Sequence, residues 1–141
     1  MNLAVPMGID SEPAVSEPLG GLLALLSGLF EDDLRAVYVG HGLLSYASIL
    51  STPFCYLPHD AVIPGAIEAG DLQELAAAYC PNPLRMEGLV NGQNVRVEAN
   101  EARVGYQHAL EAYRDLASQF VLKAEVSETD VLTSWILNSF E

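Results

Sequence analysis

Basic residues are scarce in this chain. Its 141 residues include six Lys and Arg against nineteen Asp and Glu, and the formal net charge is −13. Nucleic acids and anionic membranes are both bound through clustered Lys and Arg, so the composition argues against either as a partner. A basic protein partner, or solubility alone, is left as the role of this acidity.

Cysteine and long uncharged runs are also sparse. Cys55 and Cys80 are the two cysteines, and they give no sign of the disulfide framework of a small secreted protein. The opening residues MNLAVPMGIDSEPAV lack the positively charged start and apolar centre of a signal peptide. Residues 36–59 carry no Asp, Glu, Lys or Arg, but their Ser, Pro, Tyr and His favour buried strands over a membrane span. We therefore expect a cytoplasmic protein with no membrane insertion.

No cluster of metal-binding residues stands out either. Cys55, His59 and Asp60 lie close together in the sequence, but a zinc site needs about four ligands and no second Cys/His pair follows at regular spacing. Cys80 and His108 could complete such a site only if the fold brought them there. We expect no metal and no cofactor, with Cys55 buried and His59 or Asp60 capping a turn.

Signals for catalysis are few as well. His41 stands between two glycines and could act as an exposed general base, yet Gly-His-Gly is also ordinary turn composition. The carboxylates show no pairing typical of an acid–base dyad, and GGLLALLSG lacks the GxxxxGK spacing and the Lys of a phosphate loop. We expect no catalytic residue, and a small enzyme that uses His41 and His59 is the third of our functional hypotheses.

Periodicity divides the chain into a lead-in and one domain. Residues 1–18 hold three prolines and three acids, which predict a flexible lead-in, and residues 19–141 predict a single α+β domain. Apolar residues at helical spacing after Pro18 predict a first helix.

The next segments predict strands and then a helix. A three-stranded antiparallel meander is predicted over residues 37–39, 43–50 and 52–57, although 43–50 also fits a helical period. GDLQELAAAYC, residues 70–80, predicts a middle helix with Asp71 at its N-terminus.

The segment LRMEGLVNGQNVRVEA, residues 84–99, predicts a β-hairpin. Asn91-Gly92 is the preferred pair for a two-residue type I′ turn, which needs positive φ at both positions. That turn sets Glu87 opposite Arg96 and Arg85 opposite Glu98, and each such pair stabilises a hairpin by about 0.2–1 kcal/mol. We expect Gly92→Val to destabilise the fold because the turn requires φ > 0 there.

Two further helices are predicted after the hairpin. Residues 101–124 predict a long helix, with a stripe of buried residues at helical spacing: Tyr106, Ala109, Leu110, Tyr113, Leu116, Ala117, Phe120 and Val121. Ser127 begins a capping-box-like SETD, which predicts a short C-terminal helix. Trp135 on that helix is either an anchor for the helix on its own core or a binding anchor.

Three segments of this chain resemble one protein family. YLPHDA (56–61) resembles a strand end that enters a middle helix, LQELAAAY (72–79) resembles that helix, and LVNGQNVRVEA with YQHALEAYRDLASQFV resembles a hairpin that leads into a long helix. The element order and the acidity are similar to those of the class I chaperones of type III secretion. The resemblance implies a homodimer that holds an extended segment of a secreted effector by strand pairing and apolar grooves.

The resemblance also implies two surfaces. The effector would lie on an apolar patch formed by Leu22, Leu25, Leu26, Leu29, Phe30, Val37 and Val39. The dimer interface would be formed by Leu72, Leu75, Ala76 and Tyr79. The alternative is an acidic inhibitory, immunity-type or phage or regulatory adaptor that binds a basic protein, which explains the charge equally well.

Overall fold

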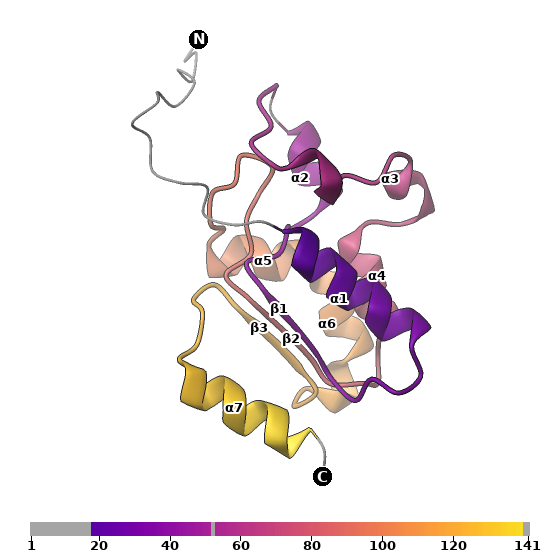
Figure 1. Ribbon diagram of the computed structural model, residues 1–141, viewed down its shortest axis with the longest axis vertical. Helices are drawn as coiled ribbons and strands as arrows, with labels where there is room; N and C mark the ends of the chain where they lie inside the picture. The colour runs from indigo at the N-terminus through magenta and orange to yellow at the C-terminus, as the bar shows by residue number, and fades with distance from the viewer. Residues whose placement is uncertain (1–17, 52, 140–141) are drawn as a thin grey trace.

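The structure is a computed structural model that describes residues 18–51 and 53–139 (Figure 1). Apart from Pro18, the predicted lead-in lies outside the described residues. Three strands, β1 (Val37–Gly40), β2 (Leu84–Glu87) and β3 (Phe120–Lys123), form one sheet in the order β1-β2-β3. Both pairings are parallel. A mixed helix-and-strand fold is confirmed, but the predicted antiparallel meander is wrong.

The register gives the sheet one apolar face and one polar face. Val37 pairs with Leu84, and Leu84 with Phe120, while Val39 pairs with Met86 and Met86 with Leu122. These side chains share the face that the core helices cover. The intervening residues share the other face, and they are Tyr38, Gly40, Arg85, Glu87, Val121 and Lys123.

Only the first of the three predicted meander strands is a strand. Within residues 43–50 the helical period prevails, and α2 (Tyr46–Leu50) forms there. Ser45 explains the outcome, because its hydroxyl accepts a hydrogen bond from the Ser48 N–H (3.0 Å) and caps the helix. The sequence after β1 therefore begins a crossover that leads to the parallel strand β2, and it does not form a hairpin with β1.

The predicted hairpin is also wrong, because Leu84–Glu87 is the central parallel strand. Gly88 (φ 62°) ends the strand, and the chain then forms a wider turn in which Asn94 (φ 59°) has the positive φ. Within that turn Val90 pairs antiparallel with Arg96. Arg85 forms its ion pair with Glu87 on the same strand, and Arg96 with Glu125, so neither predicted cross-strand pair forms.

Gly92 is required for a reason that differs from the predicted one. It is not among the residues with positive φ. A Cβ at this position would lie 2.5 Å from the Cα of Ile49 in α2. The turn therefore packs directly on the backbone of α2, and a side chain at Gly92 would force the two apart.

Four helices cover the apolar face of the sheet: α1 (Leu19–Phe30), α4 (Leu72–Ala78), α5 (Ala99–Gly105) and α6 (Gln107–Ala112) (Figure 1). The predicted first and middle helices are confirmed as α1 and α4. Gly28 allows α1 to lie close to the sheet, since a Cβ there would meet Val37 Cγ2 at 2.7 Å and Tyr79 Cε2 at 2.9 Å.

The predicted long helix 101–124 is wrong, because the segment contains α5, α6, the 3₁₀ turn η2 (Arg114–Leu116) and strand β3. Tyr106, Ala109 and Tyr113 of the predicted stripe are nevertheless buried. Phe120 is buried too, but it lies on the strand, where its ring stacks on that of Tyr113 at 5.1 Å. A short apolar run such as FVLK fits a strand as well as a helix, so periodicity alone could not separate them.

The predicted C-terminal helix is confirmed as α7 (Thr129–Asn138). It lies on the polar side of the sheet, where Trp135 packs against Arg85 with 5.8 Å between the guanidinium carbon and the ring centroid. No helix among the described residues has the length and apolar character needed to cross a membrane.

Candidate functional site

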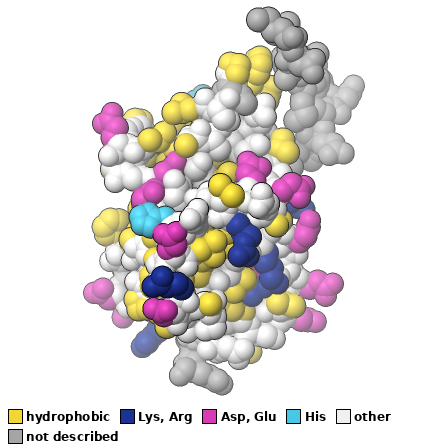
Figure 2. Space-filling view, turned by 180° about the vertical axis from the view of Figure 1, so that it is seen from behind, with side chains coloured by type: hydrophobic (Ala, Val, Ile, Leu, Met, Phe, Trp, Pro, Cys, Tyr) yellow, Lys and Arg dark blue, Asp and Glu magenta, His cyan; other side chains and the backbone are white. Residues whose placement is uncertain are grey.

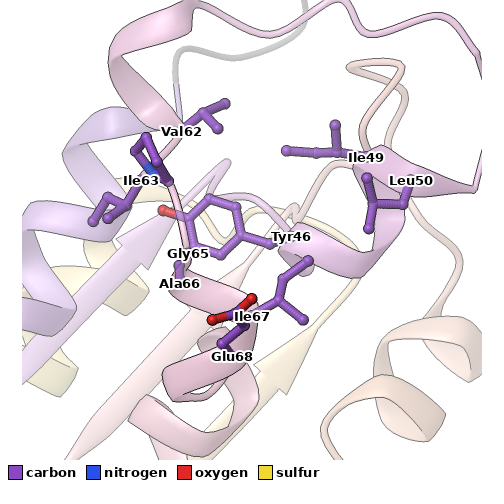
Figure 3. A pocket seen from close by; sticks show the side chains of 10 residues that line it. Tyr46, Ile49, Leu50, Val62, Ile63, Gly65, Ala66, Ile67 and Glu68 are labelled. Carbon is purple, nitrogen blue, oxygen red and sulfur yellow. The ribbon is translucent and has the colours of Figure 1, made fainter.

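The first crossover, which connects β1 to β2, contains an apolar groove of about 380 Å³ (Figure 3). After α2 the chain passes through the 3₁₀ turn η1 (His59–Ala61), a loop over 62–65 and the short helix α3 (Ala66–Ala69). The groove lies between α2 on one side and the loop with α3 on the other. The volume lies within the range of ordinary ligand pockets, which is roughly 300–1,000 Å³.

Tyr46 forms the floor of the groove and is held from both ends. Its backbone N–H donates to Asp71 Oδ1 (2.7 Å), and its hydroxyl donates to the carbonyl of Ala61 (3.0 Å). Burial raises the pKa of this hydroxyl, so Tyr46 stays neutral. Because its polar atoms are engaged with the protein, Tyr46 presents the groove with the apolar face of its ring.

Asp71 fixes the two helices around this floor. Its carboxylate accepts from the N–H groups of Tyr46 and Ala47 at the start of α2 and from Leu72 at the start of α4. Asp71 also forms a capping box with Glu74. One buried carboxylate therefore joins the groove to the core helix.

The walls are large aliphatic side chains that remain open to solvent. Leu50 is 75% exposed and Ile67 is 46% exposed, and Val62 and Ile63 are also exposed. Among the described residues, Glu68 is the single charged residue that lines the groove, and it lies beside Ile67 in Figure 3. Burial of these adjacent aliphatic groups against another apolar surface is favourable, because each Å² of apolar surface removed from water contributes about 25 cal/mol.

A polar cluster formed by Arg85, Glu87 and Ser127 lies on the other face of the sheet, and these three residues hydrogen-bond to one another. Glu87 is fully buried, and its Oε1 accepts from Arg85 Nε (2.9 Å) and from Ser127 Oγ (2.7 Å). Its Oε2 accepts from the Ser127 N–H (2.9 Å). Although burial acts to raise the pKa of Glu87, the bonds from Ser127 and Arg85 outweigh it and lower that pKa. The cluster holds the chain before α7 and leaves no free base.

The residues predicted to bind a partner lie mostly inside the protein. Leu22, Leu25, Val37 and Val39 are buried, and Leu26 and Leu29 are partly buried. Phe30 alone of this set is highly exposed, at 79%. These side chains belong to the packing of α1 on the sheet.

The residues predicted to form a dimer interface are placed in a similar way. Leu72, Ala76 and Tyr79 are buried under the other helices, and Leu75 is partly buried. The structure therefore uses this face of α4 within a single chain. The groove instead includes the VIPGAI segment, where Val62, Ile63 and Ile67 flank a Pro-Gly turn and are exposed in the described part of the chain.

The predicted chemical candidates are dispersed. No group of three His, Cys, Asp or Glu that could hold a metal ion occurs in the described part of the chain. Cys55 is exposed, so the prediction that it is buried is wrong, and Cys80 is partly buried. His108 lies 3.9 Å from Glu74 at the surface, and His41 ends β1 with φ 55°.

Comparisons with protein-family models, with curated proteins and with solved structures find no significant match for this chain. The interpretation of the groove rests on its own geometry and chemistry.

Proposed function

We propose that this protein is a non-enzymatic binding module that holds an apolar segment of a partner protein in the groove between α2 and α3. The observation that carries the proposal is the exposure of Leu50, Val62, Ile63 and Ile67 around one concave surface. Contiguous exposed apolar surface rimmed by polar residues is typical of protein interaction sites. We place this activity in the cytoplasm.

The polar content of the groove argues against catalysis. An enzyme site needs titratable groups and a few convergent polar atoms that orient a small substrate. Here Glu68 is the one carboxylate that the described part of the chain places on the lining, and the Tyr46 hydroxyl is engaged with the Ala61 carbonyl. Such a lining suits the side chains of a polypeptide better than it suits a small polar molecule.

Two specific forms of the proposal name different partners. A homodimeric chaperone for a secreted effector is one form, but the parallel sheet removes the architectural basis of the resemblance that suggested it. An acidic inhibitory or regulatory adaptor for a basic protein is the other. Light scattering at micromolar concentration separates the two, because a monomer counts against the chaperone form.

A titration of the isotope-labelled protein with a neutral amphipathic peptide of Leu and Gln tests the proposal by NMR. We expect amide shifts to concentrate in residues 46–50 and 62–68, and we expect Ile67→Glu to abolish them. Val104→Glu is the matched control, because Val104 is also an exposed aliphatic residue, on α5. Shifts elsewhere in the chain, or unchanged binding by the Ile67 variant, would contradict the proposal.

A further inference from the structure

The walls of the groove determine which backbone conformation its occupant can have. Every lining residue belongs to α2, to the loop over 62–65 or to the start of α3, and none lies on β1, β2 or β3. Several backbone donors of the loop and of α3 are engaged locally: the Val62 N–H donates to the His59 carbonyl (3.2 Å) and the Ala66 N–H to the Ile63 carbonyl (3.2 Å). An extended peptide would therefore find no strand edge with which to pair.

A helix meets this requirement, because its backbone hydrogen bonds are internal. A helix would contact the groove through its side chains alone, and one apolar stripe at i, i+3 and i+4 spacing is enough to fill an apolar groove. The volume of about 380 Å³ equals the liquid volume of about a dozen waters. That space suits two or three aliphatic anchors.

The charges around the groove determine which charged residues are favourable beside the apolar stripe of such a helix. Between Arg35 and Arg85 the chain carries no Lys or Arg. Its acids there are Asp60, Glu68, Asp71 and Glu74, and the last two are engaged in capping α4. Glu68 on the rim and the exposed Asp60 on η1 remain available to a partner.

Four of the six Lys and Arg residues lie beyond β2 or on β3. Arg96, Arg103 and Arg114 follow β2, and Lys123 ends β3, whereas Arg35 precedes β1 and Arg85 lies on β2. In the rear view of Figure 2 the Lys and Arg side chains lie at mid-height and below, whereas the first crossover occupies the upper part of the molecule. The first crossover therefore carries formal negative charge without a Lys or Arg of its own, and this local charge favours a positively charged segment beside the groove.

We propose that the groove takes an amphipathic helix of a partner protein whose apolar anchors are flanked by Lys or Arg. This inference rests on the proposed function and adds the conformation and the charge of the bound segment.

Four labelled peptides with identical Leu anchors test the inference by fluorescence anisotropy. Three of them have Lys, Gln or Glu at the flanking positions, and the fourth is the Lys peptide with a central Pro that breaks the helix. At 50 mM NaCl we expect the Lys peptide to bind about tenfold more tightly than the Gln peptide, and the Glu peptide to bind most weakly. At 500 mM NaCl the differences should shrink, because salt screens charges at the surface. The Pro peptide should bind at least tenfold more weakly than its parent.

Variants of the protein locate the charge effect. Glu68→Lys should weaken binding of the Lys peptide about fivefold, and Glu68→Gln should weaken it about twofold. Glu128→Lys is the matched control, since Glu128 is an exposed acid before α7 and the substitution changes the net charge equally. It should change the affinity less than twofold.

The outcomes separate this inference from the proposed function. Equal affinity for the Lys and Gln peptides, equal effects of the Glu68 and Glu128 variants, or undiminished binding of the Pro peptide would overturn the inference. The groove would still bind apolar segments in those cases. Absence of groove shifts with the neutral Leu and Gln peptide would instead overturn the proposed function.

Discussion

The two crossovers of this protein perform the same topological task in different ways. Each connects two parallel neighbours in the sheet by way of helices. The second crossover buries Ala102, Tyr106, Ala109 and Tyr113 against the sheet, and its charges are of both signs. The first carries only negative formal charge, and although its α4 is buried in the core, it leaves Leu50, Val62, Ile63 and Ile67 exposed around an open groove. The difference shows how one connection can stabilise a fold while the other presents a surface.

The largest expected effect is the loss of a buried ring in the second crossover. Tyr106→Ala should lower the free energy of unfolding by about 3–5 kcal/mol, because Tyr106 is fully buried and its removal leaves a cavity. Tyr106→Phe should be neutral or slightly stabilising, since the buried hydroxyl has no hydrogen-bond partner among the residues that the structure describes. Urea unfolding of both variants measures this. A large loss with Phe would show that the hydroxyl, and not the ring, is what the core requires.

The contact between the two crossovers should have the next largest effect. Gly92→Ala should destabilise the fold by about 1–3 kcal/mol, because its Cβ would collide with the backbone of Ile49. Gly20→Ala is the control, since a Cβ at Gly20 in α1 meets nothing within 4 Å, and this change should stabilise by about 0.5–1 kcal/mol. Thermal unfolding compares them. Equal stability of the Gly92 variant and the wild type would mean that the crossovers are not in close contact.

A substitution at Glu87 tests whether a buried charge on the sheet stabilises the fold independently of either crossover. Its pKa is lower in the folded protein than in the unfolded chain, so its contribution is present above the unfolded pKa, about 4.3, and disappears as the pH falls through the folded value. Glu87→Gln should cost about 1–3 kcal/mol at pH 7, and the loss should shrink as the pH falls below about 4. Urea midpoints across pH 3–7 provide the measurement. A constant difference between the two proteins would contradict this assignment.

The smallest effect on stability should come from the walls of the groove. Ile67→Glu should change the free energy of unfolding by less than about 0.5 kcal/mol, because the side chain is already half exposed. The same substitution should abolish binding of an apolar peptide. A loss of several kcal/mol would place Ile67 in the core and remove the contrast between the crossovers.

Local signals in the sequence predicted the helices α1, α4 and α7, because each depends on apolar spacing over a few residues. A capping box forms at α4, but α1 and α7 have no side-chain cap, and Ser127 of the predicted SETD box bonds Glu87 instead. The direction of the strands could not be predicted in that way. Asn91-Gly92 favours a hairpin, but the pairing of Leu84–Glu87 with strands far away in the sequence buries both faces of β2 and overrides that preference. Arg85 and Glu87 pair along one strand, a choice that a hairpin pattern could not reveal.

The groove was missed for a related reason. Apolar periodicity identifies residues that are buried, and Leu22, Leu25, Leu72 and Ala76 are indeed buried. The proposed interaction surface consists of apolar residues outside such a pattern, as in VIPGAI. Their exposure depends on how α2 and α3 are positioned, which the sequence does not state locally.

The position of Asp71 has a consequence for the thermodynamics of binding. The hydrogen bonds from Tyr46, Ala47 and Leu72 to its carboxylate fix the floor of the groove whether or not a partner is present. The conformational entropy of ordering that floor is lost when the chain folds, and it does not have to be lost again on association. If the proposed function holds, a preorganised floor beneath open aliphatic walls would let even a short segment bind with little adjustment of this protein.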